Sequence, residues 1–346
     1  MTKIDVHAPV GTREADRADH ARIDAFVRAQ PDATPFHLPA WSEAVAVGCR
    51  QRSRYLIAER ADGHIAGVLP LTDVRSPLFG RALVSAGFGV DGGVLGGAVE
   101  ALASGAVDLA RQIGTSSVEL RGGPMPAGWA QDVSTYLGFA KPLAADDETE
   151  LRAIPRKQRA EVRRAQGLGL TVSVGRSAQD VAAHYRVYAE SVRNLGTPVF
   201  PKALFQQVID TMDADILTVS SECIPVASVL SLYFGGTVYP YWGGGTAASR
   251  GMRAHEHLYF SLMRHARERG CTRFDFGRSK AGTGAAAFKK NWGFVPVPLT
   301  YARHSNGPAR VVNPLDPKYA LMVATWKRLP LWLANRVGPP IARGLG

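Results

Sequence analysis

The chain has 346 residues and a net charge of +11, from 41 Lys and Arg against 30 Asp and Glu, and 46% of its residues are apolar. This length predicts about two domains, and the apolar share is sufficient for a buried core in each. No apolar run is long enough to span a bilayer, and charges throughout the first 30 residues argue against a signal peptide. The spacing of Cys49, Cys223 and Cys271 predicts neither a disulfide framework nor a zinc site. We therefore expect a cytoplasmic protein without a bound metal.

The first half of the chain predicts a strand hairpin followed by glycine-rich and helical segments. Alternating apolar residues indicate two strands between Ile57 and Leu71. A glycine-rich strand end follows from Gly87 to Gly97, and then a helix that ends at the cap residue Gly114. We expect a further strand before Gly122 and a last strand at Gly138-Phe139.

A charged run, RKQRAEVRR at residues 156–164, predicts a helix. Pro155 suits a first helical turn, and Ala160, Val162 and Ala165 supply a modest apolar stripe. The run holds five cations and one acid, which leaves two interpretations open. The first is a solvated helix face. The second is contact with phosphates of a nucleotide, a lipid-linked diphosphate or an RNA acceptor arm.

The second half of the chain repeats the first. It predicts a hairpin from Ile216 to Leu232, a glycine-rich strand end from Tyr239 to Gly245, and again a helix, a strand and a G-F strand. Residues 110–122 match residues 266–278 at an offset of 156, and two further matches keep the order at offsets of 155 and 161. This indicates two copies of one domain. The order of elements resembles that of the acetyltransferase (GNAT) α/β fold, in which a mixed sheet has flanking helices and the acyl donor lies between two central strands.

The sequence FDFGRSKAGTGAAAFKKNWGF, residues 274–294, is the most distinctive segment. A strand stops at Gly277, a glycine-rich loop carries Arg278 and Lys280, and an Ala-rich helix brings Lys289 and Lys290. Glycines let the backbone approach an oxyanion, and Lys and Arg neutralise it. The pattern predicts an anion-holding loop, and a loop that only turns the chain is the alternative.

The C-terminal segment combines apolar and basic side chains. Residues 318–346 include Trp326 and Trp332 among several cations, and Pro330 divides them into two short pieces. One interpretation is peripheral contact with a membrane. The other is a helix packed on the domains.

Three parts of the chain follow from these patterns. We expect a first GNAT-like domain in residues 1–150, a second in residues 151–305, and a basic amphipathic tail in residues 306–346. The first copy has Pro124 and Pro126 where the second has Arg278 and Lys280. The second domain is therefore expected to be the active one and the first a support.

The second copy resembles one family more specifically. The motifs are IPRKQR at 154–159, SVRNLGTP at 191–198, residues 225–230, residues 241–245 and the segment at 274–294. They resemble the FemAB group of the GNAT superfamily, in particular the FemAB-related proteins associated with exosortase (PEP-CTERM) systems. The resemblance covers residues 35–305 and is densest from 154 to 301.

This resemblance implies a function class. Fem enzymes transfer an aminoacyl group from tRNA, and a lysine of their F-K motif, which falls on Lys289 here, contacts the pyrophosphate of the acceptor precursor. The exosortase link suggests an acceptor related to exopolysaccharide, on a phosphate-bearing or lipid-linked precursor. Fem proteins that dock tRNA often carry a coiled-coil arm, and no heptad run is present here. A tRNA donor is therefore possible but less favoured, and acyl-CoA is the other candidate co-substrate.

Acyl transfer to an amine needs a base, a group that stabilises the carbonyl oxygen and a hold on the donor's phosphates. Asp275 is the first candidate base, with a structural pairing to Arg273 or Arg278 as the alternative. His255, at a helix start, could act as a base or donor. Tyr241 could orient the acyl carbonyl, although a core aromatic is the default.

The expected phosphate contacts are less regular. Arg250, Gly251 and Arg253 precede a helix as a CoA loop would, but the glycine follows the first arginine too soon, so no tightly bound cofactor is expected. Arg193 and Asn194 are expected in a polar loop that lines the same cleft as Lys289 and Lys290. The sequence thus predicts an acyl- or aminoacyltransferase that forms an amide on a cell-envelope acceptor. The alternative is a catalytically inactive GNAT-fold scaffold that binds anionic glycan or membrane.

Overall fold

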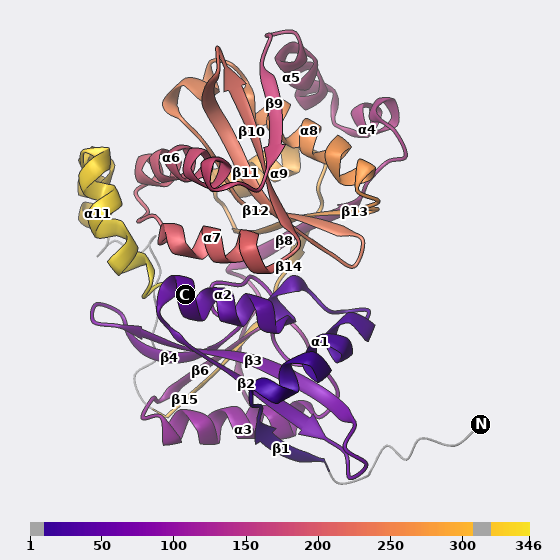
Figure 1. The fold of residues 1–346 in the computed structure, drawn as a ribbon, viewed down its shortest axis with the longest axis vertical. Coiled ribbons are helices and arrows are strands. Elements are labelled where there is room, and N and C mark those ends of the chain that lie inside the picture. Colours follow the sequence, from indigo (N-terminus) through magenta and orange to yellow (C-terminus); the bar gives the residue numbers. More distant parts are fainter. Residues whose placement is uncertain (1–9, 307–319) are drawn as a thin grey trace. The chain divides into compact units, whose positions relative to one another are not determined.

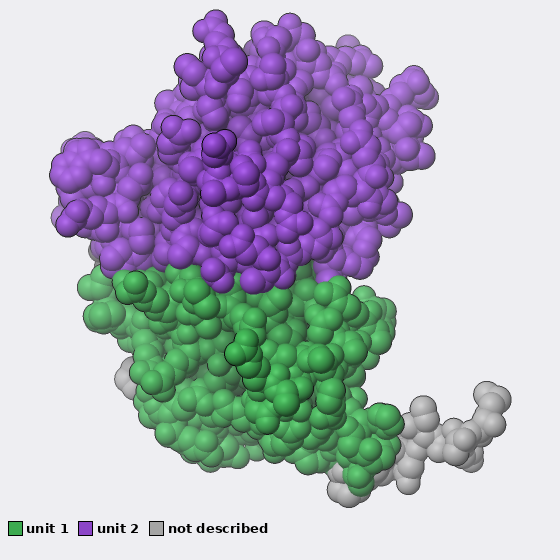
Figure 2. All heavy atoms as spheres, in the orientation of Figure 1, with its two compact units in different colours: residues 1–133, 300–312, 343–346 green, residues 134–299, 313–342 purple. Residues whose placement is uncertain are grey.

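A computed structural model describes residues 10–306 and 320–346, which form two compact units (Figures 1 and 2). Of these residues, unit 1 comprises 10–133, 300–306 and 343–346, and unit 2 comprises 134–299 and 320–342. No helix in the described part of the chain is long and apolar enough to cross a membrane.

Unit 1 is built on a mixed sheet with helices on both faces. The strands, in spatial order, are β1 (Gly11–Glu14), β2 (Arg52–Glu59), β3 (Ile65–Ser76), β4 (Gly80–Ser85), β6 (Ser117–Arg121), β15 (Tyr301–Ser305) and β7 (Ala130–Asp132), with β5 (Leu95–Gly96) paired to β3. The helices are α1 (His20–Ala29), α2 (Pro39–Cys49) and α3 (Val99–Gln112).

Strand alternation in β2 explains the two layers of helices on this sheet. Leu56 belongs to the core cluster that includes Leu102 and Ala106 of α3. The neighbouring Tyr55 points the other way, where its hydroxyl donates to the carbonyl of His37. Since successive side chains of a strand point to opposite faces, one strand can bind helices on both sides.

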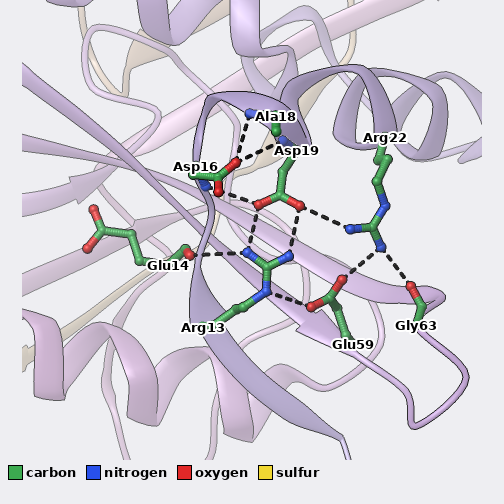
Figure 3. A network of polar contacts seen from close by, with 8 residues as sticks. All are labelled: Arg13, Glu14, Asp16, Ala18, Asp19, Arg22, Glu59 and Gly63. Carbon is green, nitrogen blue, oxygen red and sulfur yellow. Dashed lines mark hydrogen bonds and ion pairs between the residues drawn. The ribbon is translucent and has the colours of Figure 1, made fainter.

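A polar network closes the edge of unit 1 (Figure 3). The buried carboxylate of Asp19 accepts from Arg13 at 2.7 Å and from Arg22 at 3.0 Å. Both arginines also bind Glu59 at 2.7 Å. Because each arginine binds both carboxylates, the network connects β1, β2 and the start of α1. The hydrogen bonds and the positive charge of the arginines also lower the pKa of Asp19 to about 2.

Unit 2 has a seven-stranded sheet. Its strands, in spatial order, are β14 (Pro296–Pro298), β8 (Tyr136–Pro142), β13 (Arg273–Lys280), β12 (Thr237–Gly245), β11 (Ile224–Phe234), β10 (Ala214–Ser221) and β9 (Thr171–Gly175). The helices are α4 (Asp147–Ala153), α5 (Arg156–Gln166), α6 (Ala178–Leu195), α7 (Lys202–Thr211), α8 (Ala254–Glu268), α9 (Gly284–Asn291), α10 (Ala320–Arg328) and α11 (Leu331–Ala342).

Helices α6 and α7 cover one face of this sheet and α8 covers the other (Figure 1). Trp242 on β12 packs on Phe205 of α7, with ring centroids 4.8 Å apart. The next residue, Gly243, faces α8, because a Cβ at this position would lie 2.7 Å from the hydroxyl of Tyr259. The glycines at the end of β12 are therefore required by close helix packing.

The C-terminal segment divides at Pro330 as predicted. The structure has α10 and α11 on either side of this proline, and both helices contact α6 within unit 2. The part of the predicted tail from 307 to 319 lies outside the described residues. Arg343–Gly346 belong to unit 1, where Gln51 donates to the carbonyl of Arg343 at 2.7 Å.

The boundaries of the two units differ from those predicted, because each sheet contains a strand from the other half of the chain. Strand β8, which we placed in the first domain, pairs with β13 and β14 in unit 2. Strand β15, which we placed in the second domain, pairs with β6 and β7 in unit 1. A repeat in the sequence does not reveal which sheet a strand joins, since the pairing is decided by tertiary contacts.

Two local predictions were wrong. Residues 87–97 were expected to be a strand end, but they form turns apart from the two-residue strand β5. Residues 291–294 were expected to be a strand, but they form the end of α9 and a turn in which Gly293 has a φ of +85°. In contrast, the matching residues 136–139 do form a strand, as part of β8. The similarity of these two four-residue segments therefore did not mean that they have the same structure.

Candidate functional site

The central strands of unit 2 part from one another. The parallel strands β12 and β13 pair only at Thr237 with Arg273 and at Val238 with Phe274, although β12 continues to Gly245 and β13 to Lys280. On its other edge β13 bulges against β8, where the register shifts between Asp275 and Arg278. The bulge gives β13 two residues where β8 has one, which bends the strand. The predicted loop residues lie on and after this bend.

Asp275 lies at the bulge and is half-buried. Its Oδ1 accepts from the backbone N–H of Gly277 at 2.8 Å. Burial raises the pKa of Asp275, and the nearby charges of Arg273 and Lys289 partly offset that rise. Among the described residues Asp275 accepts a hydrogen bond from Gly277 but forms no ion pair with Arg273 or Arg278, so the structural pairing considered above is not present.

Lys289 of α9 turns back onto the same bulge. Its Nζ donates to the carbonyl of Gly277 at 3.1 Å and to that of Arg278 at 2.9 Å. The ammonium also lies 5.3 Å from the ring centres of Phe139 and of Phe276. Burial among these rings lowers the pKa of Lys289 to about 7, and Asp275 offsets part of the effect.

The pKa values of Asp275 and Lys289 are thus shifted towards each other. Such shifts are common where a protein moves protons, and they also occur in structural ion networks. A neutral amine has two N–H donors, and Lys289 has two carbonyl acceptors in place. The geometry therefore suits the neutral amine, and with a pKa of about 7 Lys289 is charged and uncharged in comparable amounts at neutral pH.

Arg278 and Lys280 lie on β13, which continues past the bulge to Lys280, so the prediction that the strand stops at Gly277 and a loop carries these two cations was wrong. The guanidinium of Arg278 is 4.6 Å from the ring centre of Tyr136, and the Nζ of Lys280 is 5.9 Å from the same ring. Burial and the charge of Arg278 lower the pKa of Lys280. Lys290 is exposed on α9, next to Lys289 in the chain. The structure therefore brings three of the four loop cations to the β13 bulge and leaves Lys290 in solvent.

Aromatic side chains line the α8 side of the bulge. The ring of Tyr259 lies 4.6 Å from that of Phe276 and 5.7 Å from that of Phe288. His255 is 6.5 Å from Phe288, and burial lowers the pKa of His255. His255 thus lies at the edge of this group, and its role as a base or donor stays a prediction.

Tyr241 lies on β12, where the register with β11 shifts. It is half-buried, and its ring makes an edge contact with Trp242 at 4.9 Å. Tyr241 is thus on the strand that parts from β13.

Two predicted residues lie elsewhere. Arg193 and Asn194 form the last turn of α6, so the prediction of a polar loop was wrong. The guanidinium of Arg193 donates to the carbonyl of Lys327 at 3.1 Å and holds the end of α10. Gly196 caps α6, and polar residues just before such a glycine occur both in the final turn of a helix and in a loop. The sequence alone therefore did not distinguish these two structures.

The segment before α8 resembles a phosphate loop only in part. Arg250 ends a short 3-10 helix, Gly251 lies in the following turn, and Arg253 has a φ of +49° at the N-cap of α8. The guanidinium of Arg253 forms an ion pair with Glu161 of α5. This arginine therefore joins two helices.

Sequence reasoning missed Tyr136 and Phe139, which were placed in the other domain, and Tyr259, which was not singled out. Tyr136 and Phe139 come from β8, and Tyr259 from the buried face of α8. Helical spacing marks Tyr259 as a core residue, but the contribution of β8 to this site had no signal in the sequence.

The corresponding region of unit 1 is filled by its own chain. Strands β4 and β6 also pair in parallel at only two positions, Leu83 with Val118 and Val84 with Glu119. Beyond them the N–H of Gly92 donates to the carbonyl of Arg121 at 3.0 Å. A Cβ on Gly93 would lie 2.0 Å from the carbonyl oxygen of Gly122, so only glycine fits there.

Comparison with known proteins agrees with this architecture. A family model described as an acetyltransferase (GNAT) domain matches residues 152–290. The solved structure of FemX has a TM-score of 0.63 at 16% identity and covers 90% of this chain and 100% of its own. A tandem GNAT protein from the clavulanic acid biosynthesis pathway has a TM-score of 0.55 at 13% identity, covering 87% and 99%. The chain therefore has a tandem GNAT fold.

One curated relative gives a closer sequence match over a shorter stretch. The lipid II:glycine glycyltransferase of Staphylococcus saprophyticus is 30% identical over 95 residues. The match covers 25% of this chain and 23% of the glycyltransferase. Among the described residues no group of three or more His, Cys, Asp or Glu side chains is placed to hold a metal ion.

Proposed function

We propose that unit 2 transfers an acyl or aminoacyl group to an amine on a cell-envelope acceptor. The single observation that carries the proposal is the bulge of β13, where Asp275 and Lys289, with pKa values shifted towards each other, lie where β12 and β13 part. The GNAT match over residues 152–290 supports acyl transfer as the reaction class. The relative that acts on lipid II supports a lipid-linked envelope precursor as the acceptor.

In the proposed reaction the acceptor amine attacks the acyl carbonyl, so that a C–N bond forms. The C–S bond of a thioester donor, or the C–O bond of an aminoacyl ester, breaks. Asp275 takes the proton that the amine loses, and that proton finally replaces the acyl group on the leaving sulfur or oxygen. The raised pKa of Asp275 makes its carboxylate a stronger base than an ordinary aspartate.

Other residues would hold the substrates. Arg278 and Lys280 would bind phosphate of the donor or acceptor, and Tyr241 would orient the acyl carbonyl. Lys289 would keep the bulge in shape and bias the protonation of Asp275. The loop of Arg250, Gly251 and Arg253 gives a weak hold on CoA, so acyl-CoA and aminoacyl-tRNA both stay candidate donors. Unit 1, with its filled strand gap, would be a support. The exopolysaccharide setting and a cytoplasmic location stay predictions.

A transfer assay tests the proposal. Purified protein is incubated with acyl-CoA or aminoacyl-tRNA and a lipid-linked or nucleotide-linked amino-sugar acceptor, and amide formation is followed by mass spectrometry. We expect Asp275→Asn to lower kcat/KM by about 100-fold or more, because it removes a proton acceptor. An asparagine Oδ1 can still accept from the N–H of Gly277, so the turn is preserved.

The matched control for this test is Asp210→Asn on α7, where the exposed carboxylate accepts only from Gln206 at 2.9 Å. This change should leave the rate unaltered. Transfer at wild-type rate by Asp275→Asn would contradict the role of Asp275, and no product with any donor would contradict the proposed reaction.

A specific observation favours the alternative of a binding protein without catalysis. Two of the residues predicted to hold phosphate, Lys289 and Arg253, are instead engaged with the backbone and with Glu161. A scaffold would then bind anionic glycan or membrane without forming product. The transfer assay separates the two functions, because a scaffold gives retention on the acceptor with no amide.

The C-terminal helices are proposed as a peripheral membrane contact. Leu321 and Trp332 are 79% and 70% exposed, and Lys327, Arg328 and Arg336 lie on the same two helices. Exposed Trp and Leu beside cations suit an anionic interface. We expect the double variant Leu321→Ala/Trp332→Ala to lose most of its sedimentation with phosphatidylglycerol vesicles, whereas Val47→Ala, an exposed apolar residue of unit 1, should not. Equal sedimentation of all three proteins would contradict the contact.

A further inference from the structure

One cationic feature of unit 2 is not used by the site described above, namely the outer face of α5. Arg156, Arg159, Ala160 and Arg163 border a surface hollow of about 520 Å³. These positions follow the i, i+3, i+4, i+7 spacing of one helix face. The opposite face, with Val162 and Ala165, is buried, and α5 packs on α8.

The arginines of this face lack the carboxylate partners that neighbouring arginines have. Arg164 binds Glu161 at 2.8 Å, and the same glutamate also binds Arg253. By contrast, Arg156, Arg159 and Arg163 form no ion pair within the described residues, and Arg159 makes only a long contact of 3.4 Å to the carbonyl of Arg152. Three guanidinium groups therefore surround the hollow without a counter-charge from the protein.

The charge in the first turn of α5 does not serve the stability of the helix. The first turn contains no acidic residue and has Arg156, Lys157 and Arg159 instead. Cations at this end oppose the helix dipole, which favours negative charge at the N-terminus. A sequence selected only for folding would place Asp or Glu there, so these cations indicate a ligand.

Neighbouring elements hold α5 in place beside the proposed site. Gln158 donates to Glu256 of α8 at 3.4 Å, and Glu161 is paired with Arg253. At the start of the helix, a Cβ on Gly293 would lie 3.2 Å from Cδ of Pro155. The turn after α9 is thus next to the first turn of α5, and the exposed Lys290 lies in the last turn of α9.

We infer that the α5 face binds the diphosphate group of a sugar precursor. A guanidinium group can donate two parallel hydrogen bonds to two oxygens of one phosphate, and three guanidinium groups can compensate the negative charge of a diphosphate. The hollow is open and is bordered by one helix face, and three closely spaced guanidinium groups suit a discrete, highly charged group better than the spread charge of a bilayer surface. No large apolar residue of this helix is exposed that could insert into lipid. The inference extends the proposed function, since it assigns where an acceptor precursor would be held.

Titration calorimetry with sodium pyrophosphate tests the inference directly. We expect the wild type to bind and the variant Arg156→Gln/Arg159→Gln/Arg163→Gln to bind at least 10-fold more weakly. The wild-type affinity should fall steeply with added NaCl, because exposed charges are screened. The double variant Arg156→Gln/Arg163→Gln keeps Arg159 and should show an intermediate loss, which guards against an effect of misfolding.

A matched control removes the same charge elsewhere. The control uses three exposed arginines that form no ion pair within the described residues, namely Arg52, Arg60 and Arg186. The affinity of Arg52→Gln/Arg60→Gln/Arg186→Gln for pyrophosphate should lie within twofold of the wild-type value. Thermal melting gives a second readout. Arg156 and Arg159 in the first turn oppose the helix dipole, whereas Arg163 in the last turn complements it, so the effects offset and the α5 triple variant should melt at about the wild-type temperature.

Further probes identify the source of the diphosphate and the outcomes that overturn the inference. Farnesyl diphosphate represents a lipid-linked precursor and UDP-N-acetylglucosamine a nucleotide-linked one, and stronger binding of either than of pyrophosphate supports the inference. Equal pyrophosphate affinity in the wild type and the α5 variant overturns it. Binding of phosphatidylglycerol vesicles or of an RNA hairpin without any binding of pyrophosphate also overturns it.

These measurements are independent of amide formation. Pyrophosphate binding at α5 without any transfer would leave the inference standing and contradict the proposed reaction. If instead the wild type forms the amide and the α5 variant binds pyrophosphate as well as the wild type does, the inference is overturned and the proposed reaction stands.

Discussion

At the scale of single residues, Lys289 has the most unusual environment of the candidate site. Its amine is held by two backbone carbonyls of β13 and lies between two phenylalanine rings. A phosphate-binding lysine needs an accessible charge, whereas this one is directed into the protein. The observed contacts instead favour a role in which Lys289 shapes the strand that carries Asp275 and Arg278.

The pKa of Lys289 predicts how stability depends on pH. With a folded pKa of about 7, below the unfolded value of about 10.4, the native state binds fewer protons than the unfolded state between these limits. The free energy of unfolding should therefore rise with pH across this window, by up to about 1.4 kcal/mol per pH unit. We expect urea unfolding at pH 6 and pH 9 to show this gain in the wild type but not in Lys289→Met.

The control for this prediction is Lys290→Met, which removes the next lysine of α9. Lys290 is exposed, so its loss should leave the wild-type dependence on pH intact. A stability difference between the wild type and Lys289→Met that is the same at both pH values would show that the amine is not depressed in pKa.

At the scale of elements, helix α4 holds β8 in unit 2 through one buried carboxylate. Glu150 is fully buried and accepts from Nζ of Lys141 at 2.6 Å and from the N–H of Ala144 at 2.8 Å. The Lys141 side chain is itself only 15% exposed. Since β8 supplies Tyr136 and Phe139, this contact also supports the candidate site.

We expect Glu150→Ala to lower the free energy of unfolding by about 3 kcal/mol, because it leaves the charge of Lys141 buried without a partner. Glu148→Ala on the same helix is the matched control. Glu148 is 78% exposed and pairs with Arg152, which is 65% exposed, so this change should cost less than about 0.5 kcal/mol. Chemical denaturation measures both, and similar losses for the two variants would contradict the assignment.

At the scale of the whole molecule, the exchange of β8 and β15 makes each unit depend on chain from the other half. Strand β15 lies inside the unit 1 sheet, between β6 and β7. Its Ala302 is fully buried in the unit 1 core. A chain cut between the two repeats would therefore remove a strand from each sheet.

Truncation tests this dependence. A chain that ends at Leu299 lacks β15, and we expect the amides of β6 and β7 to exchange rapidly with deuterium because their partner strand is absent. A chain that ends at Asn306 retains β15 and should keep those amides protected. Equal protection in the two chains, measured by mass spectrometry, would show that unit 1 does not need β15.

The sequence alone determined the duplication, most of the element types and the cationic segment from Arg278 to Lys290. Glycine caps and alternating strands are local signals, so they predicted a strand at β13, although it continues to Lys280 instead of stopping at Gly277, and helices at α9 and α5. The division of the C-terminal segment at Pro330 was predicted for the same local reason. The GNAT fold followed from the order of these elements.

Only the tertiary structure decided which residues share a site. Tyr136 and Phe139 are more than 130 residues from Arg278 and Lys289 in the chain, and strand pairing alone brings them together. Burial, which no local pattern specifies, changes Lys289 from an expected phosphate ligand into an amine with a pKa of about 7. Local chemistry fixes what each segment can form, whereas the pairing of distant strands fixes the solvent, charge and partners that each side chain meets.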